Sequence, residues 1–155
     1  MPAIYLLTGP IRSGKTTRLM AWARATPGAA GLLMPDGPQG RMFHDLETGF
    51  AWPAAARLGE ARPLTIGRFQ FSRAAFEWAN ASLRGAAARP GTRWLVLDEL
   101  GPLELRGEGL APALQSILAQ PARPFHLVLV IRASLVGQVT AAFNLSRWPL
   151  RPFHP

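Results

Sequence analysis

The stretch that decides the fold of this chain reads Gly9-Pro10-Ile11-Arg12-Ser13-Gly14-Lys15-Thr16. These residues match the pattern G-x-x-x-x-G-K-[ST], the phosphate-binding loop (P-loop) that joins a strand to a helix. Lys15 is the only lysine of the chain, because every other one of the 17 basic residues is an arginine. An ammonium group on a flexible stem reaches between the β- and γ-phosphates of a nucleotide in a way that a planar guanidinium does not. The stretch therefore predicts a nucleoside triphosphate site.

The sequence on both sides of this loop supports the interpretation. A short apolar, β-favouring run at residues 4–8 ends directly at Gly9, and a helical pattern follows over residues 15–25. We expect backbone N–H groups from Ile11 to Thr16 to surround the phosphates at the helix N-terminus, where Gly9 and Gly14 allow a close approach. Residues 9–17 are thus the candidate nucleotide-binding residues, with the Thr16 hydroxyl placed to ligate Mg²⁺ and Thr17 near the α-phosphate.

A second motif, at residues 94–99, has the form of a Walker B sequence. Four apolar residues are followed there by Asp98 and Glu99. Ligands of open α/β sheets bind at the carboxyl ends of the strands, so Asp98 is the candidate residue for holding Mg²⁺. Glu99 lies one residue further and is the candidate for orienting or deprotonating a water aimed at the γ-phosphate. A solvated Asp-Glu turn is the alternative for this motif alone, and the P-loop upstream favours the nucleotide site.

Phosphoryl chemistry also uses a cation that neutralises the charge developing in the transition state. Arg132 follows the apolar run at residues 125–131 and should therefore lie on the same sheet edge as Asp98. Arg12 lies in the loop itself. Both arginines are candidates for this role, and a surface arginine is the alternative for each.

The order of the remaining patterns predicts an α/β fold. Strands are expected at 31–34, 41–46, 50–52, 94–97 and 125–131, and helices at 72–88, 109–118 and 135–143, with a weak strand signal at 64–69. The uninterrupted apolar runs are typical of strands that are buried on both faces of a parallel sheet. We expect residues 1–155 to form one P-loop domain, a three-layer α/β/α arrangement with a mainly parallel sheet and an inserted β-hairpin at residues 41–52.

The composition narrows the other functional classes. The net charge of +8 favours nucleic-acid binding, but each half of the chain (residues 1–78 and 79–155) carries a surplus of four basic residues without a dense cluster, which argues against it. There are no cysteines, which excludes disulfides and Cys-ligated zinc. No apolar run approaches the ~20 residues that a membrane-spanning helix needs, and the N-terminus does not read as a signal peptide. We therefore expect a soluble, cytoplasmic protein with no membrane partner.

The acidic motif continues in a distinctive way, as Asp98-Glu99-Leu100-Gly101-Pro102-Leu103-Glu104-Leu105. Together with residues 9–17 it resembles the thermophile-type nucleoside triphosphatases, whose relatives include the cancer-related nucleoside triphosphatases and which carry a D-E-I-G-x-M-E-L run here. Residues 45–49 also resemble that family, and the resemblance covers nearly the whole chain, weakly at 53–70 and after 133. The chain departs from the family at Arg12, where the family often has glycine, and at Pro102, where it often has lysine.

The resemblance implies a small RecA/AAA-like P-loop fold that hydrolyses several nucleoside triphosphates slowly and with Mg²⁺. It assigns the metal to Asp98, the base to Glu99 and a supporting role to Glu104, for which a structural hydrogen-bonding role is the alternative. Two other functions stay open: a nucleotide-gated switch or assembly factor with a stimulating protein partner, and a kinase for a small molecule or a nucleic-acid end. A kinase needs an acceptor pocket and an arginine-rich lid, and residues 57–73 contain four arginines.

Overall fold

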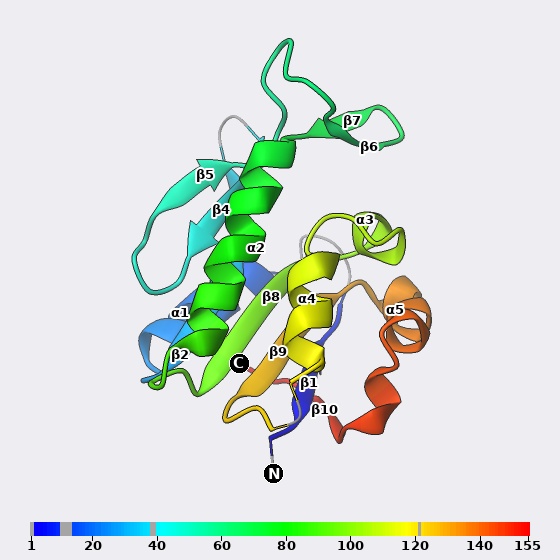
Figure 1. The fold of residues 1–155 in the computed structure, drawn as a ribbon. Helices are drawn as coiled ribbons and strands as arrows, with labels where there is room; N and C mark the ends of the chain where they lie inside the picture. Colours follow the sequence, from blue (N-terminus) through cyan, green and yellow to red (C-terminus); the bar gives the residue numbers. More distant parts are fainter. Residues whose placement is uncertain (1, 10–13, 38–39, 121) are drawn as a thin grey trace.

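The computed structural model describes residues 2–9, 14–37, 40–120 and 122–155, and a sheet of eight strands organises it (Figure 1). Neighbouring parallel strands follow the order β10–β1–β9–β8–β2, with the bounds Leu150–Pro152, Ile4–Leu7, His126–Ile131, Trp94–Leu100 and Ala29–Leu33. β4 (Gly40–Asp45) adds to β2 in the antiparallel sense and pairs in turn with β3 (Asp36–Gly37) and β5 (Ala51–Pro53). Strand β9 therefore separates β1, which leads into the P-loop, from the acidic strand β8.

Helices cover both faces of the sheet and make three layers (Figure 1). One face packs against α2 (Arg73–Ala88), α4 (Ala111–Leu118) and α5 (Val136–Ala142), and the other against α1 (Lys15–Arg24). Side chains of strand β8 alternate between the two faces. Leu95 and Leu97 belong to the apolar core on the side of α2, α4 and α5, and Val96 packs with Leu19 in the core on the side of α1. Both sides of the strand are apolar because both are buried, which confirms the predicted three-layer α/β/α fold with a mainly parallel sheet.

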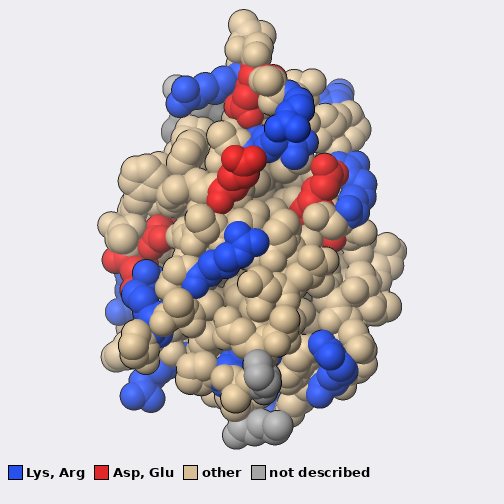
Figure 2. All heavy atoms as spheres, in the orientation of Figure 1, with Lys and Arg blue, Asp and Glu red and all other residues tan. Residues whose placement is uncertain are grey.

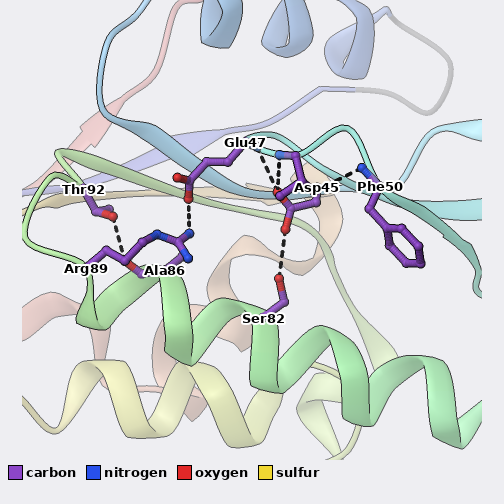
Figure 3. Close-up of polar contacts among 8 residues, drawn as sticks. Asp45, Glu47, Phe50, Ser82, Ala86, Arg89 and Thr92 are labelled. Atoms are coloured by element: carbon purple, nitrogen blue, oxygen red, sulfur yellow. Dashed lines mark hydrogen bonds and ion pairs between the residues drawn. The ribbon is translucent and has the colours of Figure 1, made fainter.

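The inserted hairpin β4–β5 is anchored to α2 by polar contacts around its turn (Figure 3). Asp45 Oδ1 accepts the backbone N–H groups of Glu47 (2.9 Å) and Thr48 (3.0 Å), and Asp45 Oδ2 accepts the Ser82 hydroxyl at 3.0 Å. Glu47 pairs with Arg89. The carboxylate of Asp45 thus shapes the turn and attaches it to α2 at the same time. This fixes β4, whose first residues reach the carboxyl edge of the sheet.

Several elements differ from the expectations. The segment with the weak strand signal forms a separate hairpin of β6 (Leu64–Ile66) and β7 (Phe69–Phe71), which stands near the top of Figure 1. The helix expected at 109–118 begins at Ala111, and a short helix α3 (Pro102–Leu105) precedes it, with Pro102 in the first position, which suits proline. Two 3₁₀ turns, Ala133–Leu135 and Leu145–Arg147, flank α5. The edge strand β10 was not expected, because Pro152 weakens the strand pattern and is tolerated only at an edge.

Charged side chains are spread over the face of the molecule drawn in Figure 2. On this face, arginines are scattered, and several lie beside acidic side chains rather than in one basic patch. Within the described part of the chain, no helix is both long enough and apolar enough to cross a membrane.

Gly31 allows β2 and β8 to approach each other. Its φ is +121°, and a Cβ at this position would lie 2.2 Å from the Val96 carbonyl oxygen and 2.6 Å from the Val96 nitrogen. The obstacle is backbone, which cannot move aside without breaking the pairing of Gly31 with Val96. Any side chain here would push apart the two strands that lead to the candidate site.

We expect Gly31→Ala to lower the free energy of unfolding by about 3 kcal/mol or more, because it combines a backbone clash with an unfavourable φ. The matched control is Gly85→Ala in α2. Apart from the backbone of its own helix, no described atom lies within 4 Å of a Cβ added there. That exchange should raise stability by about 0.5–1 kcal/mol, through better helix propensity. Urea unfolding of both variants checks this, and equal stability of the two would contradict the close approach.

Candidate active site

The described residues of the predicted phosphate loop are Gly9, which follows β1, and Gly14 to Thr16, at the start of α1. Pro10, Ile11, Arg12 and Ser13 lie outside the described residues. Gly14 caps α1 in the left-handed region with φ 78°, which glycine adopts readily. Lys15 is buried, and its Nζ donates to the Gly9 carbonyl at 3.0 Å, so the side chain connects the start of α1 to the segment after β1. An ammonium has three donors. The two that remain can serve an anion in the cavity beside it.

Asp98 is the most buried acid of the site, with 1% of its surface exposed. Its Oδ2 accepts the Met34 backbone N–H at 2.9 Å and the Thr16 hydroxyl at 3.3 Å. Its Oδ1 is buried without a hydrogen-bond partner among the described residues. Burial raises the pKa of Asp98 to about 6 against the hydrogen bond from Met34. A buried carboxylate oxygen without a partner, beside a threonine hydroxyl, fits a hard cation such as Mg²⁺.

Glu99 is displaced from Asp98 by an irregularity in the strand. The pairing of β8 with β9 shifts register between Leu97 and Leu100, and Glu99 has a φ of 61°. In a regular strand, two neighbouring side chains point to opposite faces of the sheet. The irregularity instead aims both carboxylates at the edge, as bulges beside active sites do.

Arg41 of β4 pairs with Glu99 and was not among the predicted site residues. Its Nη1 lies 3.1 Å from Glu99 Oε1, and its Nε lies 3.2 Å from Asp36 Oδ1. The guanidinium of this β4 residue therefore bridges a carboxylate of the acidic motif to one of β3. Arg41 is 58 positions from Glu99 and has no local pattern around it, so only the alternation of residues 41–46 pointed to its strand.

Glu104 is buried, and backbone donors engage both of its carboxylate oxygens. Gly101 N–H donates to Oε1 at 2.7 Å and Leu110 N–H to Oε2 at 2.8 Å. Burial raises the pKa of Glu104 to about 7 despite these hydrogen bonds. The contacts tie the two ends of α3 and its following turn together, which favours the structural role that the sequence left open.

A cavity of about 390 Å³ brings the candidate residues together. Its lining includes Lys15, Thr16 and Thr17 of α1, Glu99 and Arg41, and Arg132. Arg132 follows β9, and because β9 lies between β1 and β8, its position is beside both motifs. The structure thus brings Arg132 to the site as expected. Asp98 lies beneath the cavity, attached to its wall through Thr16 and Met34.

Two solved structures have the same fold. A human cancer-related nucleoside triphosphatase, solved in solution, aligns with a TM-score of 0.69 at 24% identity, over 98% of this chain and 88% of that one. The crystal structure of THEP1 from the hyperthermophile Aquifex aeolicus aligns with a TM-score of 0.71 at 19% identity, over 98% and 90%. The chain has the fold of these two proteins. The resemblance read from the motifs is therefore confirmed for the fold. No protein-family model and no curated sequence matches the chain.

The buried Asp98 should make the free energy of unfolding depend on pH, and the variant Asp98→Asn isolates this contribution. Because its pKa rises from 3.8 to about 6 on folding, ionising it opposes folding. The penalty is absent below pH 3.8 and complete above about pH 6. We expect wild-type protein to lose about 1–3 kcal/mol of stability relative to Asp98→Asn across that interval.

Urea unfolding of both proteins in a chelating buffer, in steps from pH 4 to pH 8, measures this difference. Glu77→Gln, which changes an exposed carboxylate of α2, is the control and should run parallel to wild type. If the stability of Asp98→Asn also followed that of wild type at every pH, Asp98 would not be desolvated as it is in the structure.

Proposed function

We propose that this chain hydrolyses nucleoside triphosphates to diphosphate and phosphate with Mg²⁺ as cofactor. The observation that carries the proposal is the junction of the two motifs, where the Thr16 hydroxyl meets Asp98 at 3.3 Å beside the buried Lys15. A P-loop threonine and a Walker B aspartate are the side chains that hold Mg²⁺ in P-loop triphosphatases. The fold shared with two nucleoside triphosphatases supports the same reaction class.

Binding is proposed to rest on Lys15, Thr16 and Asp98. Lys15 presents its other two N–H donors to the β- and γ-phosphates, and the N-terminus of α1 adds the partial positive charge of its backbone amides. Thr16 Oγ1 and Asp98 Oδ1 would hold Mg²⁺. When bound, this ion withdraws charge from the phosphate oxygens. The same ion would give Asp98 Oδ1, which has no hydrogen-bond partner among the described residues, a favourable contact, so loading the site should offset the burial of Asp98.

Hydrolysis is proposed to use Glu99 as the residue that orients water. The hydroxyl of that water attacks the γ-phosphorus, its proton passes to the Glu99 carboxylate, and the bond to the β-phosphate oxygen breaks. Arg132 lines the same cavity and can offset charge on the departing phosphates. Without an arginine supplied by a partner, such sites turn over on the order of 10⁻⁴–10⁻² s⁻¹. We expect slow turnover and broad base specificity, because a guanine-reading Asn-Lys-x-Asp motif needs a second lysine.

Lys15→Ala should weaken triphosphate binding by at least about 10²-fold, because it removes a buried charge partner of the phosphates. Equilibrium titration with a fluorescent ATP analogue and Mg²⁺ measures the affinity. The control is Arg18→Ala, which removes an exposed cation one turn further along α1 and should leave the affinity within about 2-fold. Unchanged affinity in Lys15→Ala would refute the proposed binding mode.

Glu99→Gln should keep Mg-nucleotide binding and lower phosphate release by at least about 10²-fold, since the amide cannot take the proton. Release from ATP, GTP, CTP and UTP measures the effect together with base preference. Glu108→Gln is the matched control, because Glu108 is also paired with an arginine, Arg106 at 2.9 Å, but does not line the cavity. Turnover that survives in Glu99→Gln would remove Glu99 from the role of base.

A further inference from the structure

A second and larger cavity lies against the candidate active site. It measures about 550 Å³, within the range of small-molecule pockets, which runs from about 300 to 1,000 Å³. Five residues line both cavities: Met34, Asp36, Arg41, Glu99 and Arg132. The two spaces therefore share the wall that carries the proposed base. A ligand in the second cavity would meet Glu99 from the side opposite the P-loop.

The two sides of this second cavity differ in chemistry. One side is aromatic and apolar, built from Ile66, Phe69 and Phe71 of the β6–β7 hairpin with Phe76 and Leu103. The other side is the shared charged wall of Arg41, Glu99 and Arg132. Such a site suits a ligand with a flat or apolar body and one polar end. The polar end would be held at Glu99.

The aromatic side is partly exposed, and the Arg68 guanidinium lies over the Phe69 ring at 5.8 Å from its centroid. Phe69 is 61% exposed at the hairpin, although phenylalanine gains most from burial. The hairpin that carries it is held in place, because Arg106 of the α3 turn donates through Nη2 to the Thr65 carbonyl at 2.6 Å. A fixed hairpin that presents an exposed ring to a cavity is a preformed platform rather than a loose loop.

Hydrolysis needs only a water molecule beside Glu99 and does not require a cavity of this size. A water molecule occupies about 30 Å³, far less than the space beside Glu99. A carboxylate that can accept a proton from water can accept one from an alcohol in the same position. The kinase alternative from the sequence required an acceptor pocket, and the second cavity lies where an acceptor has to be.

We propose that the second cavity binds a small aromatic or apolar alcohol and that the chain transfers the γ-phosphate of a nucleoside triphosphate to its hydroxyl. This rests on the proposed nucleotide site and adds a substrate to it. The alcohol oxygen forms a bond to the γ-phosphorus, and its proton passes to Glu99 Oε2, the oxygen not paired with Arg41. The bond between the γ-phosphorus and the bridging oxygen breaks, and the diphosphate leaves with the electron pair.

The test uses benzyl alcohol as the probe and glycerol as a matched alcohol without an apolar body. The wild-type protein is incubated with Mg-ATP and either alcohol, and ³¹P NMR follows the phosphate ester, inorganic phosphate and ADP. We expect a benzyl phosphate signal and a ratio of ester to inorganic phosphate at least about 10-fold above that with glycerol. Phosphate release without any ester would overturn phosphoryl transfer and leave the triphosphatase proposal standing, whereas neither product would overturn both.

Phe69→Ala tests the location of the acceptor. It should lower the ratio of ester to inorganic phosphate about 10-fold and weaken benzyl alcohol binding, measured by saturation-transfer NMR with Mg-ADP present. Phe50→Ala is the matched control, since Phe50 is also an exposed phenylalanine (54%) but lies on Trp78, away from both cavities. It should leave phosphate release and the ester ratio unchanged.

Two other results would overturn the proposal. A higher KM for ATP in Phe69→Ala, without change in the ester ratio, would place the base of the nucleotide itself in the second cavity. No saturable binding of benzyl alcohol at millimolar concentrations would show that the cavity does not take a small apolar alcohol, and would leave it to the side chain of a partner protein.

Discussion

The site depends on one buried carboxylate. Asp98 joins three parts of the chain that are distant in sequence, since it ends the regular part of β8, accepts the Thr16 hydroxyl of α1 and accepts the backbone N–H of Met34 after β2. Burying this charge opposes folding, as the raised pKa of Asp98 shows. The apolar alternation of β8 and β9 against two helical layers has to compensate for it. Stability is given up here at the position where we propose that a cation binds.

The elements that could be predicted are those with a strong local signal. The apolar runs of β8 and β9 and the glycines before α1 are each recognisable from the local sequence. Their order along the chain predicted the three-layer fold. It also predicted that Lys15, Asp98 and Arg132 lie at the same edge of the sheet. The β6–β7 hairpin and β10 have strands of three residues, too short for a period to show. The ion pair of Arg41 with Glu99 joins distant strands through an irregular step in β8, and no local pattern encodes such a step.

The fold shared with two nucleoside triphosphatases leaves the reaction to the site. What a P-loop does with the γ-phosphate depends on what stands on its far side. In this chain the proposed nucleotide site has a charged wall that it shares with an aromatic cavity, and the inserted β4–β5 hairpin supplies one of the two arginines of that wall. The contacts of Asp45 with Ser82 and of Glu47 with Arg89 keep the hairpin on α2 (Figure 3). They thereby help to hold Arg41 at Glu99.

The solitary lysine has a consequence outside phosphate binding. Apart from the amino terminus, Lys15 carries the only primary amine of the chain, and it is buried with its Nζ on the Gly9 carbonyl. Acylating reagents, which spread over many lysines in most proteins, have one side-chain target here. A nucleotide bound as proposed would shield this amine, so the extent of its reaction would report occupancy of the proposed site. Any modification directed at a lysine side chain would likewise fall on the proposed nucleotide site and would block the binding that we propose there.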